Sequence, residues 1–115
     1  MGHLSTHVLD TSRGAPATDV FIEVRAAGGV DPIATATTNA QGRTEAPLLP
    51  ERLMTRGEYE LTFHIGDYFR RNGVALTDPP FLDRVVIRIG VADASATYHV
   101  PLLIAPYGYS TYRGT

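Results

Sequence analysis

The sequence contains no cysteine, no tryptophan and no lysine, and its ten basic residues are all arginine. Without cysteine the chain has no disulfide, no thiolate nucleophile and no Cys-ligated zinc or iron–sulfur site. Without lysine it has neither a Schiff-base residue nor the lysine of a phosphate-binding loop. These absences exclude several large classes of enzyme before any motif is considered.

Positive charge is also scarce. Twelve acidic residues outweigh the arginines and give a formal net charge of -2, which argues against a nucleic-acid partner. No apolar run approaches the roughly 20 residues of a membrane helix, so no membrane association is expected. The N-terminus lacks the basic and apolar regions of a secretory signal, and with the absence of cysteine this predicts a cytoplasmic protein. The 115 residues predict a single domain over 1–115.

Glycine and proline, at 11 and 8 residues, divide the chain into short segments that alternate between apolar and polar positions. Alternation with period two, rich in β-branched and aromatic residues, is typical of half-buried strands. Many such strands separated by turns predict a β-sandwich. The expected strands lie near residues 3–10, 19–27, 32–38, 43–46, 57–65, 84–92, 96–105 and 108–112.

One segment departs from this alternation. Residues 66–73 place an aspartate near the start and Asn-Gly at the end, which predicts a short helix with a left-handed stop. Residues 77–80 contain consecutive prolines and are expected to form a loop. Gly14 and Gly42 lie in turns that require positive φ. Arg43 directly follows the second of these turns, where a solvated turn charge is the plain alternative to a functional role.

Two histidines project away from the predicted core. On an extended strand His7 faces opposite to Thr6 and Val8, and His99 faces opposite to Tyr98 and Val100. Each imidazole is therefore either solvated or part of a second interface.

No spacing of histidines and carboxylates forms a recognisable metal cage. His3 and His7 share a strand face but are about 13 Å apart at ~3.3 Å per residue, too far to share an ion. A metal site assembled from His7 and His99 across two strands is geometrically possible. His64 shares the polar face of its strand with Glu58 and Glu60 and is expected to be solvated. The serines, Ser5 included, have no nucleophile context.

Four segments together carry a specific resemblance. They are LSTHVLDT at 4–11 with GAPA at 14–17, TNAQGR at 38–43, YHVPLL at 98–103 and PYGYSTYRG at 106–114. In order and over essentially the whole chain, they resemble the transthyretin-like 5-hydroxyisourate hydrolases. The resemblance implies an all-β sandwich of two four-stranded sheets with one short helix. It also implies a homotetramer whose active sites lie at the dimer–dimer interface.

The implied reaction is hydrolysis of 5-hydroxyisourate, a cyclic amide, and it requires no nucleotide, metal or organic cofactor. The resemblance assigns His7 and His99 to water activation and proton transfer, with His99 preferred as the base. Histidine suits this task because its ordinary pKa of about 6.5 lies near working pH. Arg43 is assigned to hydrogen-bond the carbonyl and stabilise negative charge.

The C-terminal residues complete the implied site. Tyr112 and Thr115 are expected to line the pocket, and Gly114 to shape the tail together with Arg113, which is alternatively paired with an acidic neighbour. The family motif usually ends in serine, so Thr115 is a departure that keeps the hydroxyl and adds a methyl group.

Two other interpretations are open at this point. The first is a non-catalytic transthyretin-like carrier of a small aromatic ligand, against which the polar trio His7, Arg43 and His99 counts. The second is an interaction sandwich of the fibronectin kind, against which the whole-length resemblance counts.

Overall fold

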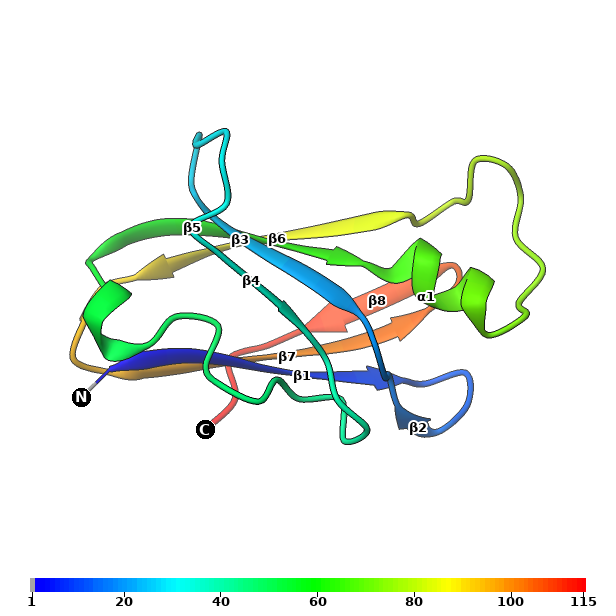
Figure 1. Ribbon diagram of the computed structural model, residues 1–115, viewed down its shortest axis with the longest axis horizontal. Helices are drawn as coiled ribbons and strands as arrows, with labels where there is room; N and C mark the ends of the chain where they lie inside the picture. Colours follow the sequence, from blue (N-terminus) through cyan, green and yellow to red (C-terminus); the bar gives the residue numbers. More distant parts are fainter. Residues whose placement is uncertain (1) are drawn as a thin grey trace.

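Two four-stranded sheets face each other in the computed structural model, which describes residues 2–115 (Figure 1). The first sheet has the order β2 (Ala15–Pro16), β1 (His3–Asp10), β7 (Thr97–Ala105), β8 (Gly108–Thr111). The second has the order β4 (Ala34–Thr37), β3 (Phe21–Ala26), β5 (Gly57–His64), β6 (Arg84–Val91). The predicted all-β sandwich with one short helix, α1 (Ile65–Arg71), is confirmed.

The central pair of the first sheet joins the two ends of the chain. β1 and β7 run parallel, whereas the other strand pairs of residues 2–115 are antiparallel. Their register sets Ser5 beside His99 and His7 beside Pro101. Motifs more than 90 residues apart in sequence therefore lie on neighbouring strands.

The core fills the space between the sheets and follows the predicted alternation. In β1, Leu4, Thr6 and Val8 are buried, and the residues between them are half-buried. Full burial of one such aliphatic side chain stabilises the fold by about 1.5–3 kcal/mol. Because a slip of one residue would move all of them to the outer face, the buried set fixes the register and with it the placement of the histidines.

The strand expected at 43–46 is wrong. The hydrogen bonds to β1 lie on either side of this segment, where Val8 donates to the carbonyl of Gly42 at 2.8 Å and Leu4 pairs with Leu49. Between these points the Thr44 hydroxyl turns back onto the carbonyl of Ala46, and Pro47 has no N–H to offer a ladder. The sheet edge is formed instead by the two-residue strand β2, which the alternation did not predict.

The predicted helix and turns are present. α1 begins one residue earlier than expected and ends at Arg71, and Gly73 follows in the left-handed region with φ of +75°. Gly42 has φ of +77°, and a Cβ there would lie 2.3 Å from the carbonyl oxygen of Val8. Only glycine allows this turn to approach β1 so closely.

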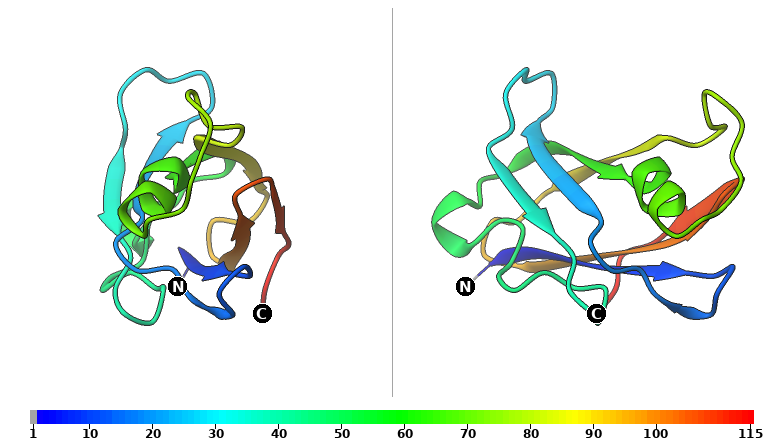
Figure 2. Two further views of the ribbon diagram at one scale, coloured as in Figure 1. Left: turned by 90° about the vertical axis from the view of Figure 1, so that its right-hand side faces the viewer. Right: turned by 45° about the vertical axis from the view of Figure 1, so that its right-hand side comes forward.

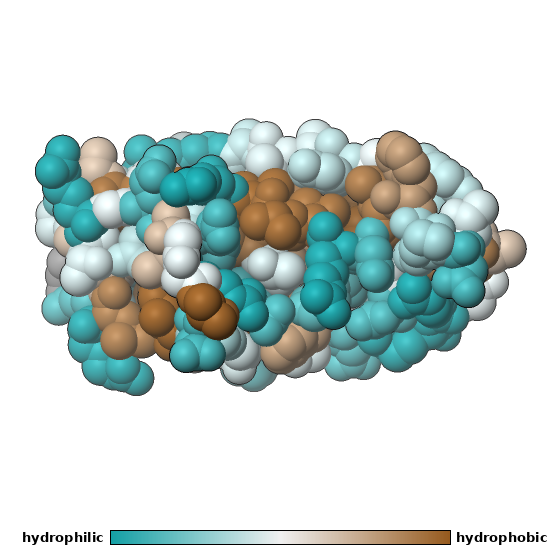
Figure 3. All heavy atoms as spheres, turned by 90° about the horizontal axis from the view of Figure 1, so that it is seen from above, coloured by the Kyte–Doolittle hydropathy of each residue, from teal (hydrophilic) through white to brown (hydrophobic). Residues whose placement is uncertain are grey.

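Figure 2 shows α1 at one end of the sandwich. A single 3-10 turn, η1 (Glu51–Leu53), precedes β5. Seen from above, over the β4–β3–β5–β6 sheet, hydrophobic groups gather in the middle of a largely hydrophilic face (Figure 3). None of the helices within residues 2–115 has the length and apolar character that crossing a membrane requires.

Candidate active site

His7 and His99 share the outer face of the β1–β7 pair. Both are half-buried, whereas their strand neighbours Thr6, Val8 and Val100 are buried toward the core. Since His99 lies beside Ser5, His7 is two residues farther along the adjacent strand. The prediction that both imidazoles face away from the core is confirmed.

The turn before Arg43 holds His7 in place. Nε2 of His7 lies 2.8 Å from the carbonyl oxygen of Gln41. Because a carbonyl oxygen only accepts hydrogen bonds, Nε2 of His7 carries a hydrogen. The Asn39 side-chain oxygen accepts from the backbone N–H groups of Gln41 and Arg43 and so stabilises the turn.

Arg43 leaves this turn with an exposed side chain. Within residues 2–115 its guanidinium makes no hydrogen bond and no ion pair. Its positive charge nevertheless acts on His99. The arrangement thus presents an unneutralised cation beside an imidazole, which is the disposition that a group stabilising an anion requires.

Burial and positive charge both act on the imidazole of His99. Burial lowers the pKa of His99 below its ordinary value, and the charges of Arg43, His7 and His3 lower it further. Nδ1 of His99 lies 2.8 Å from the hydroxyl oxygen of Ser5. The neutral imidazole therefore predominates at neutral pH, and Nε2 is the ring nitrogen left for a substrate.

The C-terminal tail closes the other side of His99. The backbone N–H of Gly114 donates to the carbonyl of His99 at 2.7 Å. A Cβ on Gly114 would lie only 2.7 Å from Cδ2 of the imidazole, so glycine is what allows this contact. Arg113 donates to the carbonyl of Thr97 and lies over the Tyr98 ring at 4.2 Å, and within residues 2–115 it makes no ion pair with an acidic side chain.

Tyr112 and Thr115 are both exposed, and Thr115 directly follows the Gly114 that contacts His99. Tyr112 is 60% exposed and, with Arg113, lines a groove between β6 and β8 that also includes Ile87 and Tyr98. Thr115 is exposed at the end of the chain. Within residues 2–115 neither side chain makes a hydrogen bond to His7, Arg43 or His99.

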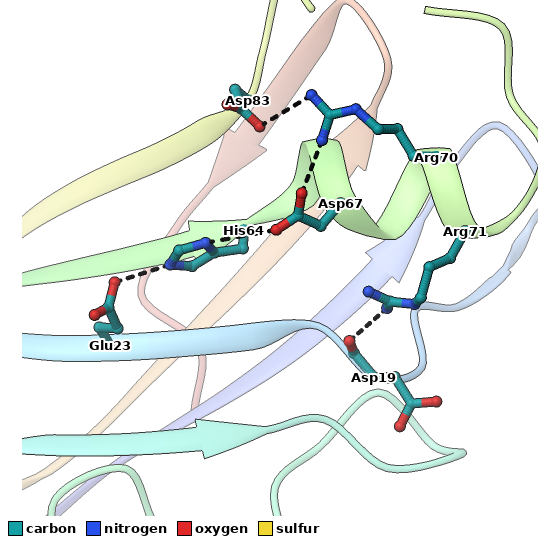
Figure 4. Close-up of polar contacts among 7 residues, drawn as sticks. All are labelled: Asp19, Glu23, His64, Asp67, Arg70, Arg71 and Asp83. Atoms are coloured by element: carbon teal, nitrogen blue, oxygen red, sulfur yellow. Dashed lines mark hydrogen bonds and ion pairs between the residues drawn. The ribbon is translucent and has the colours of Figure 1, made fainter.

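His64 corrects an expectation of the sequence. Its side chain is only 14% exposed, and Nε2 lies 2.8 Å from a carboxylate oxygen of Glu23 (Figure 4). Asp67 lies near its other ring nitrogen at 3.9 Å, and Phe21 packs against the ring. His64 is thus part of a charged cluster with α1 rather than solvated, because β3 places Glu23 beside the end of β5.

Sequence reasoning missed three contributors to the site: the Ser5 hydroxyl, the Gln41 carbonyl and the charge of His3. Strand alternation does place His3 and Ser5 on the face of His7, and that signal alone could have marked them. Of the residues described here, no three His, Asp or Glu side chains are grouped so as to hold a metal ion.

The chain is similar to known proteins along essentially its whole length. The sequence model of the HIUase/Transthyretin family matches residues 4–114. The 5-hydroxyisourate hydrolase of Ralstonia nicotianae is 54% identical over 117 residues, covering 100% of both chains. Among solved structures, Klebsiella pneumoniae 5-hydroxyisourate hydrolase has a TM-score of 0.84 at 37% identity and full coverage of both chains. Sea bream transthyretin in complex with thyroxine has a TM-score of 0.83 at 28% identity, covering 97% of this chain and 94% of that one. The chain therefore belongs to the HIUase/transthyretin family.

Proposed function

We propose that this protein is a 5-hydroxyisourate hydrolase that opens the cyclic amide to 2-oxo-4-hydroxy-4-carboxy-5-ureidoimidazoline during urate degradation. The observation that carries the proposal is the pairing of His7 and His99 on one outer sheet face with the Arg43 turn beside them, where the charge of Arg43 helps to lower the pKa of His99. Full-length identity of 54% to a relative with this name supports the same substrate.

In the proposed mechanism, Nε2 of His99 takes a proton from water while the water oxygen bonds to the amide carbon. The carbonyl oxygen gains negative charge, and the guanidinium of Arg43 donates hydrogen bonds to it. The carbon–nitrogen bond then breaks, and the leaving nitrogen takes the proton from the His99 imidazolium. His7 assists proton transfer through Nδ1, because its Nε2 is held as a donor to Gln41.

Tyr112 and Thr115 are proposed to line the substrate pocket once the protein assembles. The proposed assembly is a homotetramer with active sites at the dimer–dimer interface. Half-buried Leu9 and Leu103 on the histidine face support it, because apolar side chains on an outer sheet face favour association. The groove between β6 and β8 also supports association, because both strands are sheet edges with unpaired backbone groups. Residues 1–115 are proposed to form one such domain, and the cytoplasm is the proposed compartment.

The test uses 5-hydroxyisourate generated freshly from urate with urate oxidase. Loss of its ultraviolet absorbance is followed with and without the protein, because the compound also decays spontaneously. The proposal predicts strong acceleration by the full chain and none by a chain that lacks residues 112–115. Binding of an apolar aromatic ligand without acceleration would instead support a transthyretin-like carrier.

A further inference from the structure

The hydroxyl of Ser5 is hydrogen-bonded to one ring nitrogen of His99, the proposed catalytic base. Its oxygen lies 2.8 Å from Nδ1 of His99, within the usual range for a hydrogen bond. The two residues come from the ends of the chain, and the parallel register of β1 and β7 sets them directly beside each other. The contact therefore depends on the pairing of β1 with β7.

We infer that Ser5 is a positioning residue for the hydrolysis: it accepts a hydrogen bond from Nδ1–H of His99 and so keeps the lone pair at Nε2. The inference rests on the proposed function, since a base needs that lone pair. The tautomer of a histidine is set by the hydrogen bond that its other nitrogen makes. When Nε2 takes a proton from water, the same Nδ1–H bond to Ser5 remains, so the ring keeps its orientation through the step.

The other groups around His99 do not hold Nδ1, which leaves the Ser5 hydroxyl as its partner. The charged groups that act on the ring are Arg43, His7 and His3, all of which bear positive charge when protonated. No carboxylate among residues 2–115 pairs with His99, so a neutral hydroxyl is the group that holds Nδ1. A carboxylate there would favour the imidazolium and raise the pKa, whereas a hydroxyl orients the ring without doing so.

Gly114 fixes the opposite edge of the ring. The tail approaches Cδ2 so closely that a Cβ at residue 114 would lie 2.7 Å from it. Cδ2 is bonded to Nε2, so the tail limits rotation of the imidazole on the side of the reactive nitrogen. Ser5 at Nδ1 and Gly114 at Cδ2 together restrict rotation of the imidazole from both edges.

The experiment compares Ser5→Ala with Ser5→Thr, which keeps the hydroxyl. Ser95→Ala is the matched control, because it removes a serine hydroxyl hydrogen-bonded at 2.6 Å to Asp93 in a turn of the chain that holds none of the proposed site residues. We expect Ser5→Ala to lower kcat about tenfold or more with a smaller change in KM. Ser5→Thr should restore most of the loss, and Ser95→Ala should match the wild type.

The readout that a structural role would not move is the tautomer of His99, measured by long-range ¹H–¹⁵N NMR above its pKa. The wild type should show the hydrogen on Nδ1, and Ser5→Ala should show a mixture with Nε2–H. An active wild type with the hydrogen on Nε2 would overturn the inference while leaving the proposed function intact. So would unchanged kcat in Ser5→Ala, or an equal loss in Ser5→Thr. A wild type that does not accelerate hydrolysis would instead overturn the proposed function.

Discussion

His99 and His64 lie on the outer faces of the two sheets, both half-buried, yet their neighbours differ in sign. His99 is surrounded by positive charge and a neutral hydroxyl, and these surroundings lower its pKa. His64 lies between the carboxylates of Glu23 and Asp67. In the proposed mechanism the side chain on one sheet is thus a neutral base, whereas the side chain on the other sheet belongs to a charged cluster. The sign of the neighbouring charges, rather than exposure, distinguishes the two histidines.

The largest expected effect comes from removing each imidazole in turn. His99→Ala should lower kcat by about 10²–10⁴-fold, because general acid–base catalysis contributes that much. His64→Ala should leave kcat within about twofold of the wild type, because the charged cluster contains none of the proposed catalytic groups. Initial rates of 5-hydroxyisourate loss measure both. Equal losses of kcat in the two variants would contradict the different roles of His99 and His64.

Removing the cation beside His99 should come next. Arg43→Gln should lower kcat about 10²-fold, since Arg43 is proposed to stabilise the developing oxyanion. Because Arg43 lowers the pKa of His99, its removal should raise that pKa and move the acid limb of the pH–rate profile to higher pH.

Arg70→Gln is the control for Arg43→Gln, since Arg70 pairs with Asp67 on α1 in the His64 cluster. It should leave the acid limb in place. An acid limb that stays fixed in Arg43→Gln, or moves equally in Arg70→Gln, would contradict the assignment of charge around His99.

A smaller effect is expected from crowding the imidazole. Gly114→Ala would bring a Cβ to 2.7 Å from Cδ2 of His99, so the ring or the tail must shift. Misplacement of a catalytic group on this scale lowers kcat by roughly 10–10²-fold. Gly108→Ala is the control, because nothing lies within 4 Å of a Cβ at that position. Measured kcat values that agree between the two variants would argue against the tail as a support for His99.

The smallest effect concerns the other sheet. Hydrogen bonds from His64 and then Arg25 lower the pKa of Glu23, so its carboxylate stabilises the fold above its ordinary pKa of 4.5. That contribution is lost as pH falls from about 4.5 through the lower folded-state value. Glu23→Gln should lower the free energy of unfolding by about 1 kcal/mol at pH 7. The deficit should shrink at acid pH, as urea titrations at several pH values would show. A deficit that stays constant with pH would contradict the role of the carboxylate.

The outline of the fold could be predicted because it follows from local patterns. Alternation located the long strands, and Asn-Gly marked the end of α1. Pairing between distant strands could not be predicted this way. The 43–46 segment has strand composition, but Pro47 and the inward hydrogen bond of Thr44 keep it from forming a ladder.

For the site, too, local sequence patterns identify some residues and miss those whose partners are distant in sequence. His7, Arg43 and His99 were named from the family resemblance, and alternation placed both histidines on the outer face. Ser5 was dismissed because it lacked a nucleophile context, since nothing local reveals that it lies beside His99, 94 residues away. His64 was expected to be solvated for the same reason, because Glu23 reaches it from a strand 41 residues earlier.

The central claim is that a neutral His99 on the β1–β7 face acts as the base. The most direct test measures kcat/KM for 5-hydroxyisourate against pH and titrates the His99 imidazole by NMR in the same protein. The account predicts that the acid limb coincides with the His99 titration and that both lie below the ordinary histidine pKa of 6.5. An acid limb above that value, or one that does not follow the His99 titration, would contradict it.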